Sequence, residues 1–209
     1  MAATPAKTIF TLGHSNLEPE RFLALLAQAS VELVADVRSL PQSARFPQFS
    51  QAALENILRS ENIAYKFFGE ELGGRPDDPA AYFDDGRVNY PARRRSYAFQ
   101  AGLERLLGLA EEKAVALLCA EEDPLDCHRF LMISPELVAA GPPPVHLRKD
   151  GSRETQEAAE NRLLAAQGFA GVAANTLFPE ARAEALEKAY ELQAQRAAFR
   201  VDPTTLRSW

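Results

Sequence analysis

The sequence predicts a three-layer α/β domain, in which a mostly parallel sheet is flanked by helices, with a C-terminal helical extension. Two observations predict this fold. Short runs of β-branched and aromatic residues alternate with longer stretches whose apolar residues lie three and four positions apart, as in βα units. The chain has 209 residues, of which 46% are hydrophobic and 25% charged, which is typical of a globular domain and not of a disordered or rod-like protein.

Five strands are predicted from the short runs. They cover residues 8–12, 31–37, 64–68, 114–119 and 144–147. A helical stretch separates most of them, and strands joined in this way run parallel. We expect these units to form one α/β domain over residues 8–170, with a helical extension over residues 171–209 that packs on the core or on a partner subunit.

The helices are predicted from their ends and from their apolar faces. Pro19 suits the first turn of the first helix, because proline lacks the amide hydrogen that would be unpaired there. Ser50 and Ser96 are expected to cap the second and third helices. A later helix over residues 154–167 is expected to end at Gly168.

The remaining segments are harder to assign. Asp126 is expected to cap a helix that bends at Pro135, since proline kinks or ends a helix. Residues 69–95 and 141–144 are rich in glycine, proline or both, and we expect no regular structure in them. A connection as long as 69–95 inside a compact domain usually serves binding or forms a lid.

The charge balance limits the partners. The chain carries 23 basic and 29 acidic residues, a net charge of −6, which argues against a broad basic surface that wraps nucleic acid and leaves room for a local basic pocket. No segment approaches the roughly 20 apolar residues of a membrane span, and residues 1–7 show no secretory signal. We therefore expect a cytoplasmic protein with no membrane partner, in which Cys119 and Cys127 remain reduced.

Polar residues follow four of the predicted strands. The first strand leads into Gly13-His14-Ser15, the second into Asp36-Val37-Arg38, the third into residues 69–75, and the fourth into residues 119–129. Ligands of parallel sheets bind beyond the carboxyl ends of the strands. We therefore expect these segments to meet at one edge of the sheet.

The motifs in these segments carry a resemblance. In chain order they are Gly13-His14-Ser15, Asp36-Val37-Arg38, Leu72-Gly73-Gly74, Cys119-Ala120-Glu121 and Cys127-His128-Arg129. With them the chain resembles the domain-of-unknown-function 488 family from about Thr8 to Leu147, including a Val-His pair at His146. The resemblance implies a small α/β protein whose activity is not settled. The acidic residues 121–123, Pro135 and the helix after residue 178 depart from the family pattern, and the last leaves the oligomeric state open.

Cys127 is the predicted reactive residue. If Asp126 caps the helix, then Cys127, His128 and Arg129 occupy its first turn, where free amide hydrogens and the helix dipole favour a thiolate. The same amides and Arg129 would hold a phosphate or carboxylate. The alternative is that Cys127 is a small buried apolar group.

Cys119 ends an apolar strand, and packing in the core explains it as well as a functional role does. The order strand, cysteine, loop, arginine, helix is similar to rhodaneses, but three carboxylates at residues 121–123 would repel an anion. Zinc binding by Cys119, Cys127 and His128 is a third hypothesis, although the spacing is not the usual C-x₂₋₄-C and the adjacent Cys127 and His128 need an unusual backbone to reach one ion.

Three further groups have both a structural and a functional interpretation. His14 either projects into the site or is a hydrogen-bonded structural histidine. Asp36 and Arg38 face the same way on an extended chain, and they either bind substrate or pair with each other. Four arginines within residues 87–95 either close over an anionic substrate or lie on a solvated surface.

We expect an enzyme, a hydrolase or group transferase, that acts on a small phosphorylated or nucleotide-like substrate at a Cys/His/Arg site. The expected catalytic residues are Cys127, His14, His128 and Glu121, and the expected substrate-binding residues are Ser15, Asp36, Arg38, Gly73, Gly74, Arg129 and Arg94. The competing function is a non-catalytic module that binds a nucleotide or a nucleic-acid end. The sequence names no cofactor, and a homodimer through the C-terminal helix is a further expectation.

Overall fold

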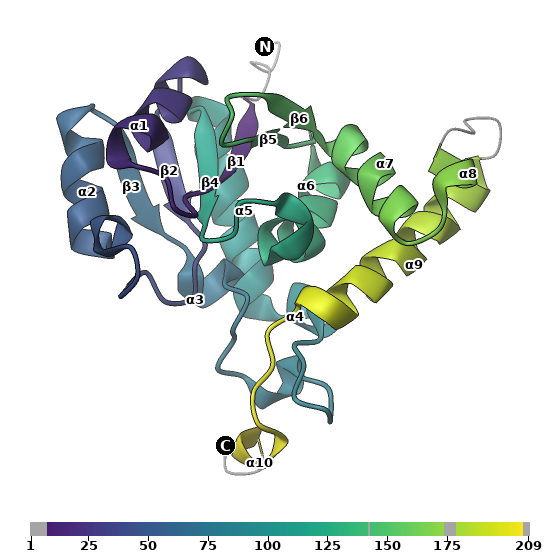
Figure 1. Cartoon of the computed structure of the whole chain (residues 1–209). Coiled ribbons are helices and arrows are strands. Elements are labelled where there is room, and N and C mark those ends of the chain that lie inside the picture. Colours follow the sequence, from purple (N-terminus) through teal and green to yellow (C-terminus); the bar gives the residue numbers. More distant parts are fainter. Residues whose placement is uncertain (1–7, 142, 174–178, 207–209) are drawn as a thin grey trace, which may run out of the picture.

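The protein is built around one six-stranded sheet, seen in a computed structural model that describes residues 8–141, 143–173 and 179–206 (Figure 1). The sheet order is β3-β2-β4-β1-β5-β6. The strands are β1 (Ile9–Gly13), β2 (Leu33–Asp36), β3 (Ala64–Phe67), β4 (Val115–Cys119), β5 (Val145–Leu147) and β6 (Arg153–Thr155). The five predicted strands all pair in parallel, and only β6 is antiparallel to its neighbour β5.

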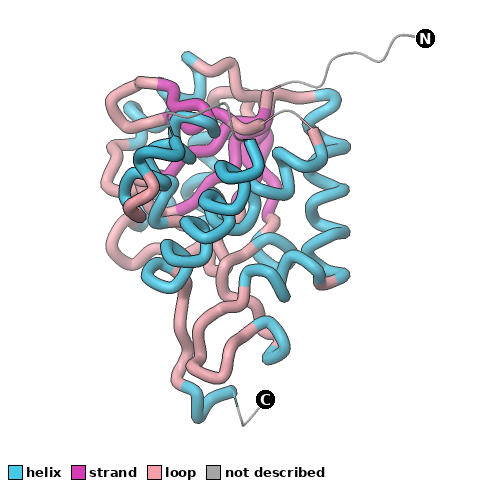
Figure 2. The backbone as a smooth tube through the Cα atoms, turned by 90° about the vertical axis from the view of Figure 1, so that its right-hand side faces the viewer, coloured by secondary structure: helices cyan, strands magenta, loops and turns pink. Residues whose placement is uncertain are grey.

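Helices cover both faces of the sheet, which confirms the predicted three-layer α/β fold (Figures 1 and 2). One face is covered by α1 (Pro19–Gln28) and α2 (Gln51–Ser60). The other face is covered by α5 (Tyr97–Glu112), α6 (Ser134–Ala140), α7 (Gln156–Ala166) and α9 (Pro179–Ala197). Each layer buries an apolar helix face against the sheet, which is the main stabilising contribution to a fold of this kind.

The serine caps are only partly as predicted. Ser96 caps α5, where its side-chain oxygen accepts a hydrogen bond from the Phe99 amide at 3.3 Å. Ser50 occupies the N-cap position of α2, but its side chain accepts from the Ser43 amide at 3.2 Å and not from an amide of its own helix. The end of the 154–167 helix at Gly168 is confirmed by a positive φ of 88° at that glycine.

The prediction that Asp126 caps a helix is wrong. Asp123 takes a capping role instead, because its carboxylate accepts from the Leu125 amide at 2.9 Å and starts the short helix η3 (Pro124–Asp126). Cys127 is extended, with φ −130° and ψ 141°, and its carbonyl accepts the first hydrogen bonds of the next helix. That helix begins as the π-helix η4 (Arg129–Ile133) and continues as α6, with Pro135 in the first turn of α6.

The expectation that residues 69–95 lack regular structure is also wrong. The segment contains α3 (Gly69–Leu72), η2 (Pro79–Ala81) and α4 (Tyr90–Arg95). Asp78 caps η2 and Asn89 caps α4, each through its side-chain oxygen, and each helix has a proline in its first turn. Asp78 and Asn89, together with the prolines that follow them, are thus helix starts and not loop signals.

The C-terminal helices pack against the rest of the protein. The elements are α8 (Ala170–Ala173), α9 and α10 (Pro203–Leu206). Ala185 and Ala189 of α9 are buried in the same apolar cluster as α5 and α7. After α9 the chain pairs with the segment before α4, where the Val88 amide donates to the Phe199 carbonyl at 3.0 Å. The expected contact of α9 with a second subunit stays a prediction.

Three of the predictions concern residues that lie wholly or partly outside the described ranges. They are the absence of a secretory signal at residues 1–7, the irregular segment 141–144 at residue 142, and the extension 171–209 at residues 174–178 and 207–209. Among the described residues, the structure contains no helix whose length and hydropathy would let it span a bilayer.

Candidate functional site

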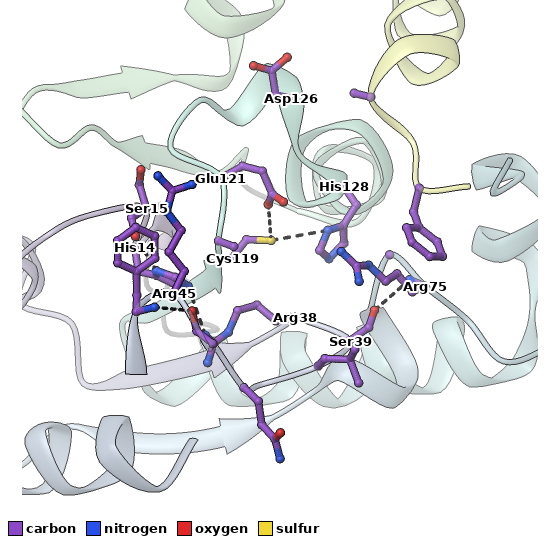
Figure 3. A pocket seen from close by; sticks show the side chains of 18 of the residues that line it. His14, Ser15, Arg38, Ser39, Arg45, Arg75, Cys119, Glu121, Asp126 and His128 are labelled. Atoms are coloured by element: carbon purple, nitrogen blue, oxygen red, sulfur yellow. Dashed lines mark hydrogen bonds between the residues drawn. The ribbon is translucent and has the colours of Figure 1, made fainter. Parts of the chain in front are cut away.

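A cavity of about 590 Å³ opens at the carboxyl ends of the central strands (Figure 3). This volume is within the range of small-molecule sites. The residues that line it include His14, Ser15, Arg38, Ser39, Arg45, Gly74, Arg75, Tyr90, Cys119, Glu121, Asp126, His128 and Phe199. Residues that follow β1, β2, β3 and β4 therefore do meet at one edge of the sheet.

A sulfur, a carboxylate and an imidazole meet in this cavity. The Cys119 Sγ atom lies 2.9 Å from Oε2 of Glu121 and 3.6 Å from Nδ1 of His128. Nε2 of His128 lies 2.9 Å from the Val37 carbonyl oxygen. Because a carbonyl only accepts, Nε2 carries the hydrogen, and in the neutral ring Nδ1 directs its lone pair at the sulfur.

Cys127 lies behind this group and does not line the cavity. Its side chain is 1% exposed, and its sulfur accepts a hydrogen bond from the Arg129 amide at 3.4 Å. The prediction that Cys127 is the sulfur facing the substrate is therefore corrected to Cys119, which is 3% exposed and lines the cavity. The extended backbone at residue 127 turns its side chain inward under η3.

The two sulfurs and His128 form one cluster. The Sγ atoms of Cys119 and Cys127 and a ring nitrogen of His128 all lie within 4.8 Å of one another. Burial and the neighbouring Cys127 sulfur raise the pKa of Cys119. Burial opposes ionisation of Cys127 as well, but the Cys119 thiol and the Arg129 guanidinium outweigh it and lower the pKa of Cys127.

His14 lines the cavity, but both of its ring nitrogens are occupied. Nε2 lies 3.2 Å from Nη1 of Arg38, which only donates, and Nδ1 lies 3.0 Å from the Ser15 carbonyl. The ring stacks on Phe49 at a centroid distance of 4.5 Å. Burial and the nearby Arg38 charge lower the pKa of His14 to about 4. These contacts make His14 part of the cavity wall, and its predicted role as a proton carrier stays a prediction.

Asp36 and Arg38 pair with each other, as the structural interpretation predicted. Nε and Nη2 of Arg38 donate to the Asp36 carboxylate at 2.8 and 2.6 Å. The Tyr65 hydroxyl donates to the same carboxylate at 2.9 Å. Asp36 is fully buried and does not line the cavity, so it is a partner of Arg38 and not a substrate contact.

Arg129 does not reach the cavity either. It is fully buried, and its guanidinium donates to the hydroxyl of Thr11 and to the carbonyls of Glu121 and Glu122. These contacts tie the loop that follows Cys119 to the sheet. The role of Arg129 is thus to position this loop, and the predicted anion contact is corrected because its donors face the protein interior.

The two predicted substrate-binding glycines permit close packing. A Cβ atom on Gly74 would lie 2.8 Å from Cγ of His128, so the glycine lets this ring sit against the backbone. A Cβ atom on Gly73 would meet the Gly69 carbonyl and lie 2.5 Å from the Ser39 hydroxyl. Gly74 lines the cavity and Gly73 does not.

The acidic loop faces the cavity with fewer charges than the sequence suggests. Glu122 pairs with Arg148 at 3.1 Å, and Asp123 pairs with Arg162 at 2.7 Å, both outside the cavity lining. Of the three consecutive acidic residues, only Glu121 lines the cavity. The objection that three carboxylates would repel an anion therefore applies to one of them.

The arginines of residues 87–95 do not close over the cavity. Arg94 pairs with Glu136 at 3.5 Å, and Arg93 is buried and donates to the carbonyls of Glu70 and Glu71. Neither these two nor the other two arginines of the segment line the cavity, so the prediction of Arg94 as a substrate contact is wrong in its placement. The segment contributes Tyr90 to the cavity wall instead.

Two other arginines line the cavity. Arg45 lies over the Phe46 ring at 5.4 Å and Arg75 over the Phe199 ring at 4.4 Å. Both are exposed, and they lie on the two sides of Cys119 in Figure 3. Arg45 was not predicted because it does not adjoin the strand end: the chain after β2 returns to the same edge of the sheet nine residues after Asp36.

Comparison with known proteins adds one match. The sequence profile of the family described as Domain of unknown function DUF488 matches residues 18–134, more than half of the chain. The matched region includes Cys119, Glu121 and His128 and excludes His14 and Phe199. Neither the curated proteins nor the solved structures contain a significant match. The chain belongs to the DUF488 family.

Proposed function

We propose that the protein is an enzyme, a hydrolase or group transferase, that acts on a small phosphorylated or nucleotide-type substrate in this cavity. One observation carries the proposal. Reactive side chains, those of Cys119, Glu121 and His128, share a cavity with the unpaired guanidinium groups of Arg45 and Arg75. This combination brings groups that move protons or electron pairs next to groups that hold negative charge.

The two arginines support an anionic substrate. In the described part of the chain, neither Arg45 nor Arg75 forms an ion pair, although the protein as a whole is acidic. A guanidinium group offers paired N–H donors that match phosphate oxygens. The rings of Tyr90 and Phe199 add apolar wall on which the rest of the substrate, such as a base, would pack.

Glu121 is the group to which we assign proton transfer. Its carboxylate is exposed to the cavity and has no arginine or lysine partner among the described residues. In hydrolysis, a water attacks phosphorus and gives its proton to Glu121. The ester oxygen leaves with the electron pair of the broken P–O bond and takes up the proton that Glu121 accepted from the water, which returns Glu121 to its carboxylate form. His14 and Arg38 form the rigid wall against which the substrate is oriented.

Sulfur transfer of the rhodanese type has less support. Such a site needs free amide hydrogens around a reactive thiolate, but the amides of Leu125, Asp126 and Cys127 are hydrogen-bonded within the loop itself.

We also propose that the protein resides in the cytoplasm. Cys119 and Cys127 are free thiols, which suits this reducing compartment.

The proposal is tested by turnover and by binding. We expect the wild-type protein to release phosphate from chromogenic phosphomonoesters or from nucleoside monophosphates. Glu121→Gln is expected to lower kcat by roughly 10²–10⁴-fold with little change in KM, as for loss of a general acid or base. Release of phosphate that is unchanged in Glu121→Gln would contradict this role of Glu121.

Arginine variants test the substrate site separately. Arg45→Ala and Arg75→Ala are expected to weaken nucleoside monophosphate binding at least tenfold each in calorimetry, which corresponds to about 1.4 kcal/mol. Arg95→Ala, an exposed arginine that does not line the cavity, is the matched control and should bind as the wild type does. Tight binding without any turnover would support the non-catalytic alternative, and equal binding by all variants would exclude this cavity as the anion site.

A further inference from the structure

We propose that Cys119, Cys127 and His128 bind one divalent metal ion of the zinc class, with a fourth coordination position that opens into the cavity. The argument starts from spacing. Nδ1 of His128 lies 3.6 Å from the Cys119 sulfur and 3.8 Å from the Cys127 sulfur. With Zn–S bonds of about 2.3 Å and Zn–N bonds of about 2.0–2.1 Å, a tetrahedral site places sulfur and nitrogen roughly 3.6 Å apart. Both sulfur–nitrogen distances are close to this value, and the two sulfurs lie within 4.8 Å of each other.

The orientation of His128 fits a ligand. A metal-bound histidine usually donates its other ring hydrogen to a carbonyl or carboxylate, which fixes the tautomer and the ring plane. Nε2 of His128 makes this contact with the Val37 carbonyl at 2.9 Å. Gly74 lies against the ring and leaves no space for a side chain there. The imidazole is therefore held with its free nitrogen toward both sulfurs.

The backbone explains how adjacent residues reach one ion. Cys127 is extended, with φ −130° and ψ 141°, whereas His128 is helical, with φ −60° and ψ −25°. This change of conformation between neighbours turns both side chains to the same point. The third ligand, Cys119, is the last residue of β4, and η3 folds the intervening loop back so that residues 119 and 127 meet. A spacing rule based on C-x₂₋₄-C motifs does not cover this arrangement.

The surroundings supply charge balance. Two thiolates and a neutral imidazole carry a charge of −2, which a divalent ion offsets. The Arg129 amide donates to the Cys127 sulfur at 3.4 Å, the kind of hydrogen bond that supports a metal-bound thiolate. The donor set of two sulfurs and one nitrogen suits Zn²⁺ and disfavours Mg²⁺ and Ca²⁺, which prefer oxygen.

The open position connects the metal to the cavity. Cys119 and His128 line the cavity and Cys127 does not, so an ion among the three faces outward on the side of Cys119 and His128. Glu121 borders the same place, with Oε2 at 2.9 Å from the Cys119 sulfur. Three protein ligands with one open position are typical of catalytic zinc, which lowers the pKa of a bound water. A catalytic role of the ion rests on the proposed function, whereas binding of the ion does not.

Metal content of the full chain is the first test. Protein purified without a polyhistidine tag and without chelator is expected to contain about one zinc per chain by mass spectrometry of the elements. After removal of zinc under reducing conditions, added Co²⁺ should give the thiolate-to-metal absorption and the intense visible bands of a tetrahedral site. Cys127→Ser and His128→Gln should each lose the bound zinc, whereas His14→Gln, a cavity histidine outside the cluster, should retain it.

The outcomes separate this inference from the proposed function. Wild-type protein that holds no zinc and gives no cobalt spectrum after reduction overturns the metal site, whatever the variants do and whether or not they fold. A Cys119–Cys127 disulfide found with that result would assign the pair to redox chemistry instead. Bound zinc without turnover of any phosphorylated substrate would leave the metal site standing and refute the proposed function. Turnover by protein from which zinc has been removed would support the proposed function and refute a catalytic role of the metal, while the metal content and the cobalt spectrum would still decide whether the site binds zinc.

Discussion

Gly74 lies against the imidazole ring of His128, and a Cβ atom on this glycine would be 2.8 Å from Cγ of the ring. The two residues come from different parts of the chain, one from the segment after α3 and the other from the loop after β4. The position of the ring in the cluster therefore depends on a residue that has no functional group. Several consequences of such contacts are open to measurement.

Gly74→Ala should disturb the cluster more than the fold. The added methyl group displaces the His128 ring, and we expect roughly tenfold weaker zinc binding, the lower end of the effect of changes behind a metal ligand. Competition with a zinc indicator measures this affinity. Gly108→Ala is the control, because a Cβ atom at position 108 of α5 meets nothing within 4 Å, and we expect unchanged zinc affinity there. Equal affinity in both variants would contradict the assigned contact.

Gly13→Ala should destabilise the whole protein. A Cβ atom at this end of β1 would overlap the carbonyl group of Glu121, which is backbone and is also held by Arg129. Because neither strand nor loop can yield easily, we expect the free energy of unfolding to fall by about 3 kcal/mol or more. Urea unfolding followed by circular dichroism measures the change, and a loss of less than about 1 kcal/mol would show that the loop is free to move.

His146 should make the protein less stable in acid. It is fully buried, contacts Thr11 and Gln156, and has a pKa lowered to about 4, chiefly by burial. Between the unfolded value near 6.5 and pH 4, the unfolded state binds the extra proton, so stability falls as pH falls through this window. At pH 5 the expected loss relative to pH 7 is roughly 2 kcal/mol from this group.

His146→Gln tests this pH dependence, because glutamine stays neutral throughout. The difference in unfolding free energy between pH 7 and pH 5 should be smaller in the variant than in the wild type by about that 2 kcal/mol. Chemical unfolding at both pH values gives the comparison. Identical losses in the two proteins would mean that protonation of His146 does not differ between the folded and unfolded states.

Asp36→Asn should leave Arg38 without its ionised partner. The pair is buried, with the side chains of Asp36 and Arg38 0% and 6% exposed, so the remaining guanidinium charge is only slightly hydrated. We expect a loss of about 3–5 kcal/mol in unfolding free energy. Lys188→Ala breaks an exposed pair with Glu191 and should cause no measurable change. Comparable losses in both variants would contradict the importance of burial at Asp36.

The sequence was a good guide where a local pattern decides the structure. The apolar runs of β1, β2 and β4 depend on hydrophobic burial and the serine at the start of α5 on one hydrogen bond, and both are visible in the sequence. The sequence pattern gave the wrong helix start at Asp126, because Asp123 and Pro124 form a competing helix start three residues earlier. β6 was missed because its three residues, Arg153–Thr155, carry no apolar run.

The site was predicted in outline and not in its details. The rule that ligands bind beyond strand ends brought His14, Arg38, Cys119 and His128 to one place. It does not say which of two buried cysteines faces the cavity, since that depends on the extended backbone at Cys127. Nor does the sequence reveal that Arg129 and Arg94 are held away from the cavity, because their partners are backbone carbonyls and the distant Glu136 carboxylate.

Ala197 and Phe199 form one wall of the cavity, although the residues beneath them lie far earlier in the chain. During synthesis the sheet, both sulfurs and both cavity arginines emerge well before this wall does. A nascent polypeptide with a completed sheet therefore still has an unfinished pocket, and assembly of the binding site is a late event in the life of each new molecule.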